Sequence, residues 1–309
     1  MKQEARKAAG WIIVVLFAGA ATWYIWNNLT TIVDSVRKLS LFAVVIYVIL
    51  SGCILYVDGL SLRLFFKPFG IHLKHFFLLS CAASFINQIT PFRGGAGFKA
   101  WYMKKEYGFD YMKSVVTTFG EYILIFLVTS AFALMNMAWL YASQGIHTFW
   151  TTVIFLVVFL SCLFLTVMRG FRFPGQHRVI QVLNEMSTNW KTLVKHKGQI
   201  VWLSIYASLS IGITTLMFIV VSNGMSVHLP YQIAFQLALL SNLAFFVNIT
   251  PGSIGIVEFV CLAGGVELGL EPGRLAIVLL VMRAIRSTSV LLYGFVCKPI
   301  LFSTMKSIQ

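Results

Sequence analysis

The sequence predicts an all-α polytopic membrane protein with two inverted-topology repeats, about six spanning helices and two re-entrant helical hairpins. Three observations support this class: a strongly apolar composition, two similar breaks in apolar segments, and basic residues that gather in alternate loops. Of the 309 residues, 59% are hydrophobic and 11% are charged, and the mean hydropathy is +0.84. These values exclude a soluble protein of this length, so we treat residues 1–309 as a single integral membrane domain.

Six apolar stretches are long enough to cross the roughly 30 Å hydrocarbon core of a bilayer as helices. They lie at Ala8–Trp26, Leu39–Val57, Ser114–Tyr141, Phe149–Met168, Ile200–Ser222 and Leu275–Val296. Two further segments, His75–Tyr107 and Tyr231–Leu270, each contain an apolar stretch, a Pro/Gly break and a second helical stretch. Between Lys99 and Glu106 the first of them carries three lysines and a glutamate. Because so many charges cannot face lipid, we expect re-entrant hairpins here.

The two breaks have similar sequences. Ser84 to Gly95 reads SFINQITPFRGG and Ala244 to Gly255 reads AFFVNITPGSIG, and the two share Phe, Ile, Thr, Pro and Gly when aligned on their prolines. In membrane proteins, a corresponding pair of broken hydrophobic segments indicates a transport site between two structural repeats. We therefore expect a first repeat over residues 8–141 and a second over 149–302. Chance Pro/Gly breaks in an unrepeated polytopic protein remain the alternative.

Basic residues predict the orientation of the chain. Nineteen of the 24 Lys and Arg fall on one side of the expected membrane, so the positive-inside rule places both termini in the cytoplasm. Six spans and two hairpins then give both halves the same element order with opposite orientation. Eight full spans would also leave both termini inside, but would place the basic cluster of residues 99–113 outside. Residues 172–199 have the apolar periodicity of an interfacial amphipathic helix, which we expect to be a cytoplasmic connector.

Composition also indicates which partners to expect. The net charge of +14 follows the topology and forms no basic domain, so anionic lipid of the bilayer is a simpler partner than nucleic acid. Five cysteines without CxxC spacing and six scattered histidines predict neither disulfides nor a metal site, and we expect no cofactor. An intramembrane enzyme that acts on a lipid phosphate would need a nucleophile or metal ligands beside its carboxylates. The sequence contains no such motif, so we expect no enzyme.

Four ionisable residues fall within or beside expected spans, where an unpaired charge costs several kcal/mol: Glu121, Glu258, Arg283 and Arg286. One interpretation is that the carboxylates simply neutralise the arginines as ion pairs. The other is an anion-binding site, because a helix that restarts within the membrane presents free N–H groups and a partial positive charge to an anion. The candidate substrate-binding residues of that site are Arg93, Gly94, Gly95, Lys99 and Glu121 in the first half, and Pro251, Gly252, Gly255, Glu258, Arg283 and Arg286 in the second.

At these residues the sequence resembles the transmembrane region of lysylphosphatidylglycerol synthases, a flippase-like family with many stand-alone members. The match is carried by Pro251-Gly252-x-x-Gly255-x-x-Glu258 with Arg283 in the next span, and by Pro91-x-Arg93-x-Gly95. It departs from the family at Ala96 and Tyr122, where the family often has Glu and Arg, which weakens any claim that the two halves have equal roles.

The resemblance implies a flippase that moves an anionic phospholipid or a polyprenyl-phosphate-linked glycan precursor between the leaflets of a bacterial inner membrane. Glycan or lipid biosynthesis enzymes are the partners it implies. The sequence contains no soluble synthase domain, so we expect no aminoacyl transfer. Two alternatives stay open: an ion-coupled transporter of a soluble anion, which would share the broken helices, and an intramembrane lipid-phosphate enzyme.

Overall fold

The computed structural model describes residues 39–66, 72–90, 93–167, 197–246 and 250–306. These ranges form nine α-helices and one short 3-10 turn, and they contain no β-strand. The all-α polytopic class is therefore confirmed. The first expected span, Ala8–Trp26, and nearly all of the expected connector at 172–199 lie outside the described residues.

Within the described ranges, five helices are long and apolar enough to cross a membrane. They are α3 (Leu41–Phe66), α6 (Tyr111–Gln144), α7 (Phe149–Val167), α9 (Lys197–Gly224) and α12 (Pro272–Lys306). Each corresponds to one of the expected spans. Two of them extend well beyond the expected ends: α3 continues past Val57 to Phe66, and α12 continues past Val296 to Lys306. Asp58 and Arg63 lower the hydropathy of the added stretch of α3 but do not interrupt its helix.

Four shorter helices form the two expected hairpins. Helices α4 (Leu73–Ile89, 17 residues) and α5 (Gly94–Tyr107, 14 residues) form the first. Helices α10 (Tyr231–Phe246, 16 residues) and α11 (Ile256–Glu267, 12 residues) form the second, with the 3-10 turn η2 (Pro251–Ser253) between them. Each helix falls short of the roughly 20 residues that cross a bilayer. Their re-entrant course in a membrane, and the inverted repeat that depends on it, stay predictions.

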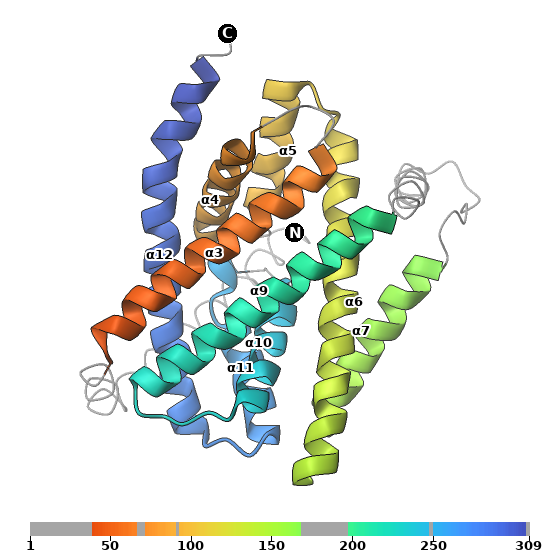
Figure 1. Ribbon diagram of the computed structural model, residues 1–309, viewed down its shortest axis with the longest axis vertical. Coiled ribbons are helices and arrows are strands. Elements are labelled where there is room, and N and C mark those ends of the chain that lie inside the picture. The colour runs from red at the N-terminus through yellow and green to blue at the C-terminus, as the bar shows by residue number, and fades with distance from the viewer. Residues whose placement is uncertain (1–38, 67–71, 91–92, 168–196, 247–249, 307–309) are drawn as a thin grey trace, which may run out of the picture.

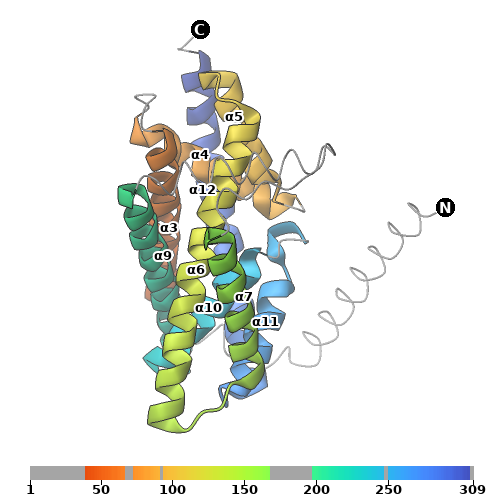
Figure 2. The ribbon, with the colours of Figure 1, turned by 90° about the vertical axis from the view of Figure 1, so that its right-hand side faces the viewer.

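The hairpins lie toward opposite ends of the helical bundle (Figures 1 and 2). Helices α4 and α5 lie in the upper part of both views, and α10 and α11 lie in the lower part. The tilted helices α3 and α9 pack along each other, α6 packs against α7, and α12 packs against α4. The largest buried cluster gathers on α10, where Leu237, Ala238 and Leu239 are fully buried. Helix α7 has the opposite character, since most of its large apolar side chains are exposed, as in a helix that faces lipid.

One carboxylate ties the far end of the second hairpin to the bundle. Glu267, the last residue of α11, accepts hydrogen bonds from the N–H groups of Trp150 and Thr151, both at 3.0 Å. Its second oxygen also accepts a hydrogen bond from the Thr151 hydroxyl. The N–H groups at the start of a helix have no partner within that helix, and a negative charge there is favourable. Glu267 therefore caps α7 and fixes the position of α11.

Candidate functional site

The tips of the two hairpins meet in the middle of the bundle. The Arg93 Nη2 group, at the tip of the first hairpin, donates a hydrogen bond to the Phe245 carbonyl of the second hairpin at 3.2 Å. Close by, the Gln88 Nε2 group donates to the Ser287 hydroxyl of α12 at 2.7 Å. Gly252 lies so near Gln88 that a Cβ atom on it would be 2.8 Å from Gln88 Oε1. The two similar breaks in the sequence are thus in direct contact.

The backbone of the second break depends on glycine. Gly252 has φ +62° and Gly255 has φ +87°, both in the region that disfavours side chains. Pro251 occupies the first position of η2, where its missing N–H costs nothing. Together these residues end α10, turn the chain and allow α11 to begin within the bundle.

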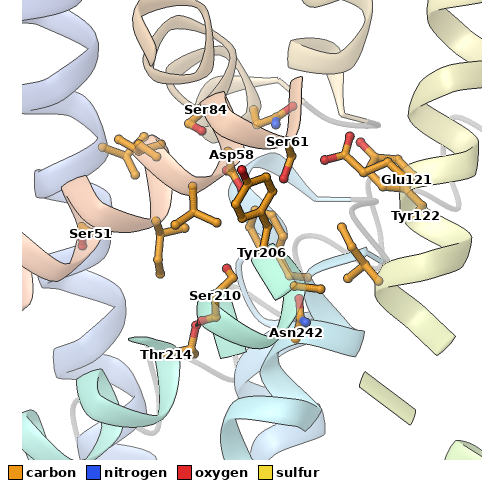
Figure 3. A pocket seen from close by; sticks show the side chains of 18 of the residues that line it. Ser51, Asp58, Ser61, Ser84, Glu121, Tyr122, Tyr206, Ser210, Thr214 and Asn242 are labelled. Carbon is orange, nitrogen blue, oxygen red and sulfur yellow. Dashed lines mark hydrogen bonds between the residues drawn. The ribbon is translucent and has the colours of Figure 1, made fainter. Parts of the chain in front are cut away.

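A polar cavity lies beside the two tips (Figure 3). It has an interior volume of about 180 Å³ and is lined by residues from α3, α4, α5, α6, α9, α10 and α12. This volume far exceeds the roughly 10–15 Å³ that one water molecule requires, so charged groups inside it can be hydrated. The charged residues in the described part of its lining are Asp58, Arg93, Lys99, Glu121 and Arg286.

Two of these cations stack on one aromatic ring. The guanidinium of Arg286 lies 4.5 Å from the centre of the Phe245 ring, and that of Arg93 lies 5.6 Å from it. Arg93 also lies 4.5 Å from the centre of the Tyr122 ring. Cation–π contacts hold a guanidinium without occupying all of its N–H donors. Arg286 accordingly has no ion pair or hydrogen bond with any described residue, and its donors are open to an anion in the cavity.

The two carboxylates balance part of this positive charge. Asp58 on α3 lies within electrostatic range of Lys99, Arg286 and Arg93. Glu121 on α6 lies within range of Lys99, Asp58 and Arg93. Three cations and two carboxylates, all ionised, leave a formal charge of about +1 in the described lining. An anion that carries one negative charge would neutralise it.

Arg283 lies outside this lining, although it is only one turn from Arg286. Its Nε group donates to Glu258 Oε1 at 2.5 Å, and its two terminal nitrogens donate to the carbonyls of Gly252 at 2.7 Å and Ser253 at 2.9 Å. Glu258 also accepts the Gly255 N–H at 2.7 Å. Arg283 and Glu258 therefore form the ion pair of the first interpretation, and together they hold the turn between α10 and α11. A direct role for either in substrate binding stays a prediction.

The first hairpin contributes its glycines to packing. The Gly95 N–H donates to Asn87 Oδ1 at 2.8 Å, and a Cβ on Gly95 would overlap the Ala83 carbonyl. A Cβ on Gly94 would overlap the Thr90 hydroxyl. The candidates that line the cavity are thus Arg93, Lys99, Glu121, Gly252 and Arg286, whereas Gly94, Gly95, Pro251, Gly255, Glu258 and Arg283 shape its surroundings.

Several polar residues of the lining are not among the candidates predicted from the sequence. Asp58 lies one residue beyond the expected span Leu39–Val57, so it was not a candidate for a site within the membrane. Tyr206, Ser210 and Thr214 follow one another at four-residue spacing on α9, so they share one face of that helix and line the cavity. Polar residues at this spacing within an otherwise apolar span were the signal that could have found them.

Comparison with known proteins agrees with the sequence resemblance. A family model described as the lysylphosphatidylglycerol synthase TM region matches residues 11–294. No curated protein matches the chain. The match covers nearly the whole sequence and, with the apolar helices, makes the chain a multi-pass membrane protein of a family connected with lipid biosynthesis or translocation. The chain therefore belongs to the lysylphosphatidylglycerol synthase transmembrane-region family.

Proposed function

We propose that this protein is a flippase of the bacterial inner membrane, which moves an anionic phospholipid or a polyprenyl-phosphate-linked precursor between leaflets. The observation that carries the proposal is the cavity beside the hairpin tips, with Arg93, Lys99 and Arg286 in its lining. A guanidinium matches the geometry of a phosphate and can donate two parallel hydrogen bonds to it. Basic residues buried among apolar helices are costly, and such residues commonly mark the path of a substrate.

The balance of charge in the cavity suits transport better than permanent binding. A site on a transport pathway must attract its substrate and also release it. The two carboxylates, Asp58 and Glu121, compete with a bound phosphate for the same cations. This competition lowers the affinity of the cavity for an anion, so that the anion can be released. The cavity still carries a net positive charge, which repels a positively charged group.

The hydroxyl groups of the cavity support a lipid headgroup as the substrate. Ser210 and Tyr206 on α9 and Ser61 on α3 line the same space as the charged residues. They can exchange hydrogen bonds with the phosphodiester oxygens or with hydroxyls of a glycerol or sugar. The lipid chains would remain in the bilayer beside the apolar outer faces of the helices.

A leaflet-accessibility assay tests this proposal. The full chain is reconstituted in liposomes with a trace of fluorescent anionic phospholipid, and an impermeant reductant then quenches the label in the outer leaflet. We expect the protein to expose the inner-leaflet label for reduction, and Arg286→Gln to slow this exposure by at least about tenfold, as loss of a charge-assisted hydrogen bond predicts. The matched control is Arg274→Gln, which removes an exposed arginine that pairs with Glu271 outside the cavity.

A soluble anion is the second candidate substrate, because the cavity is polar and large enough to hold water. Uptake of radiolabelled inorganic phosphate into the same liposomes measures this activity. Phosphate uptake without movement of the fluorescent lipid would replace the flippase by an anion transporter. Movement of the lipid without phosphate uptake is the result that the proposal predicts.

A further inference from the structure

Two carboxylates face the central cavity from different walls. Asp58 projects from α3 and Glu121 projects from α6 (Figure 3). Neither accepts a hydrogen bond from a described residue, and neither has a basic nitrogen of that part of the chain within 4.0 Å. A carboxylate at this depth must be hydrated, balanced by nearby charge or protonated. The cavity has room for water and contains nearby cations, so each carboxylate can be ionised or protonated there. Asp58 and Glu121 can therefore change their protonation state during transport.

Titratable or charged groups surround the two carboxylates on most of the elements that line the cavity, whereas α10 contributes only Ser241, Asn242 and Phe245. Lys99 comes from α5, Arg93 from the hairpin tip and Arg286 from α12, whereas Tyr122, Cys81 and Tyr206 come from α6, α4 and α9. Lys99 and Arg93 lie within electrostatic range of both Asp58 and Glu121. Because the same cations would bind a substrate phosphate, the phosphate and the carboxylates share one set of positive charges.

A buried hydroxyl farther along the α3 wall of the cavity also lacks a partner. Ser51 lies on α3 two turns before Asp58 and lines the same space. Ser51 is only 6% exposed, and its Oγ atom has no hydrogen-bond partner among the described residues. Buried polar groups are normally paired, so this hydroxyl marks a position for water or substrate.

We propose that Asp58 and Glu121 take up protons when the anionic substrate binds, so that its translocation is coupled to proton movement. The inference rests on the proposed anion site. When a phosphate engages Lys99 and Arg93, the carboxylates lose part of their positive surroundings. A carboxylate oxygen then forms an O–H bond with a proton from water on the side to which the cavity is open. After release of the phosphate on the other side, the cations again favour the ionised carboxylate, and the proton leaves there.

The coupling is reciprocal for thermodynamic reasons. If the bound phosphate favours protonation of the carboxylates, protonation favours phosphate binding by the same factor. A proton gradient should therefore drive the substrate from the acidic side to the less acidic side. Carboxylates that only position the neighbouring cations would show no such dependence.

Two measurements on reconstituted liposomes test the coupling. A pH-sensitive dye in the lumen reports proton entry after a fluorescent anionic phospholipid is added to the outer leaflet, and the reductant assay reports inward movement of that lipid. We expect lipid addition to acidify the lumen, and an acidic exterior to speed inward movement several-fold. Asp58→Asn and Glu121→Gln should each lose the acceleration and the acidification. Glu271→Gln, which alters an exposed carboxylate outside the cavity, should keep both.

The outcomes separate this inference from the proposed function. Lipid movement without lumen acidification and without response to the gradient would overturn the coupling and leave the flippase intact. Proton entry that accompanies phosphate uptake, with no lipid movement, would support the coupling and overturn the flippase. An unchanged gradient response in both variants would overturn the assignment to these carboxylates. If either variant fails to fold, Asp58→Glu and Glu121→Asp take its place, because they keep a carboxylate at a changed position. Proton entry measured with the unaltered protein tests the coupling independently of any variant.

Discussion

Gln88 of the first hairpin lies directly against Gly252 of the second, so the two broken segments support each other at the centre of the bundle. The contact leaves no space for a side chain, because a Cβ on Gly252 would lie 2.8 Å from Gln88 Oε1. Gln88 is held in place by its hydrogen bond to Ser287. The hairpin tips, α12 and the cavity beside them therefore depend on one small group of contacts.

Gly252→Val should separate the hairpin tips. The substitution places a β-branched side chain at φ +62° and against the amide of Gln88. The left-handed backbone alone costs about 1–2 kcal/mol for a residue with a side chain, so we expect a lower unfolding temperature in detergent and loss of lipid movement. Gly97→Ala is the control, because a Cβ there meets nothing within 4 Å and its φ is ordinary. Normal lipid movement by a folded Gly252→Val variant would contradict a functional role for the tip contact.

Arg283→Ala and Arg286→Ala should fail in different ways. Arg283 and Glu258 have side chains that are only 12% and 20% exposed, and removal of one member of such a buried pair costs about 3–5 kcal/mol. We expect Arg283→Ala to reduce both stability and transport, and Arg283→Lys to rescue poorly because one ammonium cannot replace the four hydrogen bonds that the guanidinium donates. Arg286→Ala should reduce transport with little change in unfolding temperature. A fully stable Arg283→Ala variant would show that the ion pair does not hold the turn.

The orientation of the hairpins predicts a pattern of thiol labelling. Cysteines introduced at Ser143, Ser226 and Lys104 would all be exposed in the fold, so their reactivity reports the side of the membrane on which they lie. After removal of the native cysteines, we expect an impermeant thiol reagent added to intact cells to label the first two positions and not the third. Labelling of Lys104→Cys from outside would contradict a first hairpin that enters from the cytoplasm.

Much of the fold could be predicted because hydropathy determines which segments fit a bilayer. The five described spans agree with apolar runs. The sequence breaks around Pro91 and Pro251 separate α4 from α5 and α10 from α11, as their prolines and glycines predict. The end of α3 could not be predicted in this way. The apolar run ends before Asp58, so hydropathy predicts the end of the span there. The helix continues because Asp58 faces the polar cavity and not lipid.

The arrangement of charges depended on helix rotation, which the sequence does not specify. Arg283 and Arg286 lie one turn apart on α12, and both were candidates for either an ion pair or an anion site. The rotation of α12 directs Arg283 to Glu258 and the turn carbonyls, and Arg286 to Phe245 and the cavity. The ion-pair interpretation thus applies to Arg283, and the anion site that we propose involves Arg286.

Protection of a single cysteine in the cavity tests the central claim that an anionic lipid headgroup binds there. Ser210→Cys, made in a chain without its native cysteines, places a thiol in the cavity lining, and Ser143→Cys places one on the exposed end of α6 as the control. We expect an anionic phospholipid in mixed micelles to slow modification of the Ser210→Cys thiol, a zwitterionic phospholipid to have little effect, and neither lipid to protect Ser143→Cys. Equal modification of Ser210→Cys with anionic and zwitterionic lipid would contradict the account.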